Sequence, residues 1–170
     1  MLLDFKKYIF VFTTLFLSSC RGEDESDLQK IDQVLNIYIK NAEGKDLLNT
    51  NIPGGFTAVR AQDLNADRAL QDITGISVKK DQDTIAYVDY ATGAVRILKD
   101  SISPSQKMYQ SDFYINLSKI VNKETVTDVD TVKVEYNWSP NLFQVSKVWY
   151  NNKLSFSKVE GQPNIIHIVK

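Results

Sequence analysis

The sequence predicts an all-β fold, a β-sandwich of the immunoglobulin-like or transthyretin-like kind, with a small β-barrel as the alternative. Three observations predict it. Apolar and polar residues alternate in several stretches, most clearly over residues 131–138. Gly, Pro, Asn and Asp separate these stretches at short intervals. The chain also lacks a succession of helical patterns, and its 43% hydrophobic and 24% charged residues are typical of a globular domain.

The first strand is expected at residues 34–39, where Leu35, Ile37 and Ile39 share one face. Residues 28–33 before it are read as a helical turn or linker. Further strands of the first half are expected at 45–49, 56–61, 75–80, 84–90 and 94–99.

Two connections in this half carry specific predictions. Residues 62–72 are rich in Leu and Ala, which favours a short helix capped by Asp63 or Asn65. Thr92-Gly93 is predicted to join its flanking strands as a tight hairpin, because Gly tolerates the backbone angles of such turns.

The second half has the strongest strand signal. Over residues 131–138 the alternation is unbroken, so we expect Val132, Val134, Tyr136 and Trp138 to face the core. A loop is expected at 101–110 and a two-residue turn at Asn151-Asn152. The remaining strands are expected at 112–117, 145–150, 154–157 and 165–169.

The amino-terminal residues read as an export signal. Lys6 and Lys7 precede an apolar stretch over residues 8–17, which is too short to span a bilayer but suits a secretory signal. The stretch closes with Leu17-Ser18-Ser19-Cys20, which resembles the lipobox of bacterial lipoproteins. That resemblance implies a diacylglycerol on the Cys20 thiol and cleavage before Cys20, and hence a lipid (palmitate-type) membrane anchor.

The expected organisation is a signal peptide over 1–19, an acidic tether over 20–33 and a single β domain over 34–170. The acidic run at 23–27 resembles the export signal of Bacteroidetes surface lipoproteins, and the body resembles uncharacterised lipoproteins of that group at 41–48, 130–136 and 148–154. The resemblance implies a cell-envelope location, in the outer membrane, facing either the cell surface or the periplasm. It implies no established activity.

Composition excludes several classes of function. The chain has 20 basic and 21 acidic residues, without the basic stripe of a nucleic-acid-binding protein. A single cysteine forbids an internal disulfide. The one histidine, His167, is expected on the exposed face of a strand. Without a second histidine, a hydrolase triad or a zinc site has too few residues, and no cofactor is expected.

Acidic residues offer two alternatives. Asp63, Asn65 and Asp67 match the opening of a calcium loop, but Arg68 stands where that loop needs glycine, so a capped, solvated loop is favoured. Paired carboxylates, namely Asp128 with Asp130 or Asp81 with Asp83, would be needed by a glycan hydrolase. These residues lie at predicted turns, where aspartate is common because its side chain stabilises the turn, and this explains their presence without a catalytic role.

Aromatic residues form 11% of the chain and offer a carbohydrate-stacking surface. Trp149 and Tyr150 are adjacent in a strand, so they point to opposite faces and one of them is the candidate ligand-facing ring. The other aromatic candidates are Tyr87, Tyr90, Tyr109 and Tyr114. The sequence therefore favours a non-catalytic binding or structural domain that contacts carbohydrate or an envelope protein. A carboxylate hydrolase and a calcium-dependent adhesion module are the alternatives.

Overall fold

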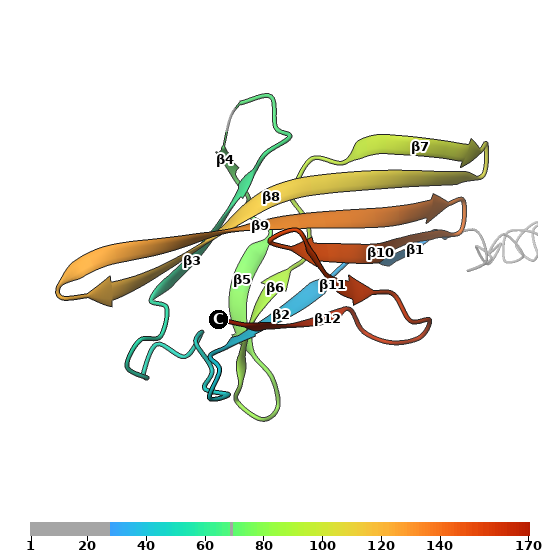
Figure 1. Cartoon of the computed structure of the whole chain (residues 1–170). Helices are drawn as coiled ribbons and strands as arrows, with labels where there is room; N and C mark the ends of the chain where they lie inside the picture. The colour runs from blue at the N-terminus through green and yellow to red at the C-terminus, as the bar shows by residue number, and fades with distance from the viewer. Residues whose placement is uncertain (1–27, 69) are drawn as a thin grey trace, which may run out of the picture.

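The computed structural model describes residues 28–68 and 70–170, and in these residues the fold is all-β, as the sequence predicts. Two sheets lie against each other around one core (Figure 1). The larger sheet contains β1 (Lys30–Asp32), β3 (Ala58–Asp63), β4 (Gln71–Asp72), β7 (Ile97–Ser103), β8 (Gln106–Val121), β9 (Glu124–Ser139), β10 (Leu142–Tyr150) and β11 (Lys153–Ser157). The smaller sheet contains β2 (Leu35–Lys40), β5 (Ile76–Lys80), β6 (Ala86–Tyr90) and β12 (Ile165–Val169).

The larger sheet has the order β1-β10-β9-β8-β3-β4, with β11 also beside β10 and β7 also beside β8. The smaller sheet has the order β12-β2-β6-β5. Most neighbours are antiparallel, but β1 pairs with β10 and β12 pairs with β2 in parallel. Both ends of the described chain are therefore held by long-range pairing.

The core follows the predicted alternation. Leu35, Ile37 and Ile39 of β2 are fully buried, as expected for one face of a strand. Opposite them, the buried side chains of the larger sheet include Phe113, Ile115, Leu117, Val132, Val134, Tyr136, Val145 and Val148. Burying this much apolar surface is the main force that holds the two sheets together.

A hairpin of two 16-residue strands, β8 and β9, runs the length of the larger sheet. At about 3.3 Å per residue it is roughly 50 Å long. Asn122 and Lys123 turn it at one end with positive φ angles. In Figure 1 that turn lies at the left, and the β7–β8 and β9–β10 turns lie together at the right, beside β1.

The helix predicted over residues 62–72 is wrong. The first two of these residues end β3, the chain then bends, and β4 returns so that Gln62 pairs with Asp72. The Asp63 carboxylate accepts hydrogen bonds from the backbone N–H groups of Asn65 (2.8 Å) and Val95 (2.6 Å). The bond to Asn65 is a local contact that favours a turn over a helix, and the bond to Val95 fixes this turn against a segment distant in the sequence.

The hairpin predicted at Thr92-Gly93 is also wrong, because β6 and β7 belong to different sheets. Glycines are needed here for close packing. A Cβ on Gly93 would lie 2.5 Å from the Ile73 side chain, and one on Gly75 would lie 2.0 Å from the Thr92 carbonyl oxygen. The segment is thus where the chain crosses tightly from the smaller sheet to the larger one.

Three further expectations need correction. The loop predicted at 101–110 is reduced to a turn at Pro104 and Ser105, between β7 and β8. Residues 30–32, expected in a helical turn or linker, form β1, so β structure begins before the predicted domain start at residue 34. The strand expected at 45–49 is only an isolated bridge between Lys40 and Asp46.

Candidate functional site

The main candidate site lies where the inner face of the larger sheet extends past the core. Strand register places Tyr109 beside Tyr136 and Trp138 beside Phe143 on this face. Together with residues before β2 and after β6, they form a hollow of about 360 Å³, which we call the aromatic pocket. Its lining is Gln29, Ile31, Gln33, Thr92, Arg96, Tyr109, Trp138 and Phe143.

Arg96 supplies a positive charge to the aromatic pocket. Its guanidinium carbon lies 4.7 Å from the centroid of the Phe143 ring and 5.3 Å from that of Tyr136, within the range of a cation–π contact. The same guanidinium donates hydrogen bonds to Gln33 Oε1 (2.6 Å) and Thr92 Oγ1 (3.2 Å). Its Nε is buried and has no hydrogen-bond partner.

The charge of Arg96 is not neutralised by the described part of the protein. None of the carboxylates in residues 28–68 and 70–170 forms an ion pair with it. Burial raises the pKa of the Tyr136 phenol, which therefore stays uncharged beside the guanidinium. A second cation is close, since Lys107 Nζ lies 4.9 Å from the centroid of the Trp138 ring.

This arrangement suits a ligand with both a flat apolar face and a negative charge. Tyrosine and tryptophan rings have flat apolar faces and polar edges. The C–H face of a sugar ring packs against the flat face of such a ring. Arginine attracts carboxylates through its permanent positive charge. The aromatic pocket can therefore bind and orient such a ligand.

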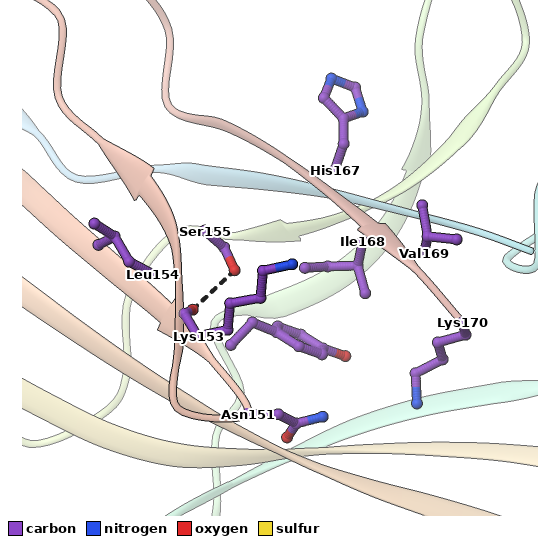
Figure 2. A pocket seen from close by; sticks show the side chains of 9 residues that line it. Asn151, Lys153, Leu154, Ser155, His167, Ile168, Val169 and Lys170 are labelled. Carbon is purple, nitrogen blue, oxygen red and sulfur yellow. Dashed lines mark hydrogen bonds between the residues drawn. The ribbon is translucent and has the colours of Figure 1, made fainter. Parts of the chain in front are cut away.

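A second hollow, of about 440 Å³, lies between the edges of β11 and β12, and we call it the edge pocket. Figure 2 shows Lys153 and Ser155 of β11 on one side and Ile168 and Lys170 on the other, with His167 pointing away. His167 is exposed, as the sequence predicts, and its ring stacks on Tyr38 at 5.2 Å between centroids.

The polar groups beside the edge pocket are largely engaged with one another. Asp130 accepts hydrogen bonds from the Tyr150 hydroxyl (2.6 Å), Asn151 Nδ2 (2.7 Å) and Lys170 Nζ (2.5 Å). Burial alone would raise the pKa of the Asp130 carboxyl, but these donors outweigh burial and lower it. This cluster is a satisfied structural network.

The carboxylates proposed for hydrolysis are placed as follows. Asp128 shares Lys170 with Asp130, at 3.5 Å. A general acid in a glycosidase needs a raised pKa, whereas that of Asp130 is lowered. Asp81 accepts hydrogen bonds from the backbone N–H groups of Asp83 and Ile85 (both 2.9 Å) and from the Tyr38 hydroxyl (3.1 Å), so it closes the β5–β6 turn.

The three calcium candidates, Asp63, Asn65 and Asp67, do not converge on one point, because their side chains have different partners or face solvent. Both oxygens of Asp63 accept backbone N–H groups, and Asn65 Nδ2 donates to Asp112 at 3.3 Å. Asp67 is exposed. Across residues 28–68 and 70–170, no group of three His, Cys, Asp or Glu side chains gathers that could hold a metal ion.

The predicted ligand-facing aromatics do not come together. Trp149 is half-buried on the outer face of the larger sheet, and Lys133 Nζ lies 5.7 Å from its ring. Tyr150 is buried on the inner face and bound to Asp130. Among the other candidates, Tyr90 is in the core, Tyr109 lines the aromatic pocket, and Tyr87 and Tyr114 lie elsewhere on half-buried strand faces.

Sequence reasoning missed Arg96. It correctly expected Trp138 to face the core, against which the ring packs, but did not predict that the ring also lines a pocket. A signal for Trp138 was present: it is the last apolar residue of the alternating run, directly before the break at Ser139-Pro140, where a core is expected to end. Nothing near Arg96 in the sequence marks it, because its aromatic neighbours come from strands more than 35 residues away.

Cys20, the predicted lipidation site, lies outside the described residues. Within the described part of the chain, no helix has the length and hydrophobicity needed to cross a membrane. In comparisons with known proteins, no family model, curated protein or solved structure matches this chain.

Proposed function

We propose that the protein is a lipoprotein of the cell envelope, anchored through Cys20, whose β domain binds an acidic carbohydrate in the aromatic pocket without catalysing a reaction. The observation that carries the ligand assignment is the position of Arg96, a cation without a carboxylate partner in the described chain, against aromatic rings that line an open hollow. The signal-like segment before Cys20 supports the anchor.

The ligand class follows from the lining of the pocket. Trp138 and Tyr109 offer ring faces, and both are only partly buried, so they can contact a ligand. Gln33 and Thr92 accept hydrogen bonds from Arg96, which leaves the Gln33 amide N–H groups and the Thr92 hydroxyl proton to donate to ligand hydroxyls. An acidic saccharide, such as one containing a uronic acid, has the ring face, the hydroxyls and the charge that these residues complement.

A binding role is also supported by the state of the acidic residues. Asp130 is buried under three hydrogen-bond donors with a lowered pKa, and Asp81 closes a turn. The lowered pKa of the Asp130 carboxyl does not suit a group that gives a proton to a leaving group. The hydrolase alternative would need a different pair of carboxylates facing one cleft.

The test is binding of the mature chain to a glycan array that contains matched acidic and neutral saccharides, followed by titration of the best ligand. We expect the acidic member of each pair to bind more tightly. Trp138→Ala should weaken binding at least tenfold, roughly 1.4 kcal/mol, because the stacking surface is lost. Arg96→Gln should remove the preference for the acidic member.

The matched control is Trp149→Ala, since Trp149 lies on the outer face of the same sheet, away from the aromatic pocket. Its affinity should stay within twofold of the unmodified protein. Equal losses in both tryptophan variants, a preference for neutral saccharides, or no binding to any saccharide would each contradict the proposed ligand.

A further inference from the structure

The point where the tether joins the β domain is fixed by hydrogen bonds. Gln29 Nε2 donates to the Ser139 carbonyl at 2.6 Å, and the Lys30 backbone N–H donates to the Asn141 carbonyl at 2.9 Å. The chain therefore enters the domain beside the β9–β10 turn. An extended chain spans at most about 3.5 Å per residue, so the nine steps from Cys20 to Gln29 reach about 30 Å.

The surface around this point carries exposed apolar side chains, and together with the adjoining Trp138 and Leu142 we call it the anchor-side rim. It includes Leu28, Ile31 and Ile102, of which Ile102 is 67% exposed. Ile102, Lys107, Trp138 and Leu142 also line a common hollow of about 270 Å³. Lys30 pairs with Leu142 across β1 and β10, so the tether and the hollow are adjacent.

The length of the molecule separates this rim from the other end. The β8–β9 turn is roughly 50 Å away along the hairpin, farther than the tether can reach. Figure 1 shows β1, the β7–β8 turn and the β9–β10 turn at one end and the β8–β9 turn at the other. If the chain is anchored at Cys20, its rim stays near the bilayer.

We propose that the anchor-side rim inserts its apolar side chains into the interface of the bilayer that holds the lipid of Cys20, which orients the domain on the membrane. This inference rests on the proposed anchor. Isoleucine and leucine side chains gain free energy by leaving water, tryptophan favours the membrane interface, and the lysine stem can lie along apolar surface with its charge in water. Because the contact is apolar, it does not require charged lipid.

The experiment uses the mature lipidated chain in phosphatidylcholine vesicles, with and without bromine on the acyl chains. Bromine quenches tryptophan fluorescence at short range. The protein has two tryptophans, Trp138 on the rim and Trp149 on the outer face of the larger sheet. We expect Trp149→Phe, which keeps Trp138, to show at least twofold stronger quenching than Trp138→Phe, which keeps Trp149.

Two isoleucines provide a matched pair in the Trp149→Phe background. Ile102→Ser removes a rim side chain and should at least halve the quenching of Trp138. Ile120→Ser changes a residue that is 56% exposed near the far end of the hairpin and should leave the quenching unchanged. Equal quenching of the two tryptophans, or equal effects of the two isoleucine variants, would overturn the inference.

Flotation of the same samples separates this inference from the proposed function. If the protein floats with the vesicles but the two tryptophans are quenched equally, the anchor is supported and only the rim proposal is overturned. A chain that carries no lipid and does not float overturns the anchor, and the rim proposal with it. Saccharide binding is measured without vesicles and is independent of both outcomes.

Discussion

At the scale of single residues, Asp130 shows how this fold accommodates a buried charge. The Asp130 residue is 5% exposed, and its carboxylate is surrounded by donors from β10, the β10–β11 turn and the last residue of the chain. The nearby Asp128 reaches the same Lys170 but its side chain is 38% exposed. Buried charges need such compensation, and exposed ion pairs contribute little.

We therefore expect Asp130→Asn to lower the free energy of unfolding by about 2 to 3 kcal/mol at pH 7, because bonds to a charged group are lost. Asp128→Asn, the matched control, should change it by less than about 0.5 kcal/mol. Urea unfolding of both variants measures the difference. If the two variants lowered the free energy of unfolding by similar amounts, the buried network around Asp130 would contribute no more stability than the exposed ion pair of Asp128.

The same carboxylate carries a pH dependence. Its pKa in the folded state lies below the ordinary 3.8, so its contribution to stability is complete above that value. The contribution is lost as the pH falls through the lowered pKa of the folded protein. The gap in stability between the unmodified protein and Asp130→Asn should thus be constant from pH 5 to 8 and shrink in the acid range below about pH 4.

At the scale of elements, the sequence predicted those turns and strands whose determining residues lie within a few positions of one another. The turn at Asn151-Asn152 is confirmed, with φ angles of 48° and 63°, and the strands expected at 34–39 and 165–169 match β2 and β12 within a residue or so. The helix over 62–72 failed because the bond from Val95 to Asp63 is a long-range contact. The loop at 101–110 failed because β7 is exposed on both faces and shows little alternation.

The β10–β11 hairpin gives a test of its turn. Asn152 has a left-handed backbone, which glycine adopts freely and β-branched residues adopt at a cost. We expect Asn152→Val to destabilise the fold by about 1 to 2 kcal/mol and Asn152→Gly to change it by less than about 0.5 kcal/mol. Thermal unfolding of each variant is the measurement.

Lys153→Val is the control for this pair, because it places the same side chain at the next residue, which is exposed and has strand backbone. It should leave the stability nearly unchanged, since valine favours strands. If Lys153→Val destabilised the fold as much as Asn152→Val, the cost would come from exposing valine and not from the backbone of the turn.

At the scale of the whole molecule, the predicted fold class is confirmed, but the candidate site could not be predicted from local patterns. The aromatic pocket joins β8, β9 and β10 to Gln29–Gln33 and to Arg96, and only the strand order brings these segments together. In the sequence, Trp149 and Tyr150 stand out because they are adjacent aromatics. The pairing of strands instead places Trp138 and Tyr109 in one pocket with Arg96, a cation that has no carboxylate partner in the described chain.

The arrangement also places the proposed binding pocket beside the proposed anchor. The aromatic pocket and the anchor-side rim share Trp138, and both lie beside the point where the tether enters. A chain anchored at Cys20 would hold its pocket close to the membrane, with the long hairpin directed away from the tether. The anchor is therefore the premise on which the cellular role depends.

The most direct test of that premise is the intact mass of the chain purified from the membranes of cells that express it. We predict a chain that begins at Cys20 and carries the added mass of a diacylglycerol with two or three acyl chains in total, and a Cys20→Ser variant that lacks this mass. An unmodified chain that begins at any other residue would contradict the account.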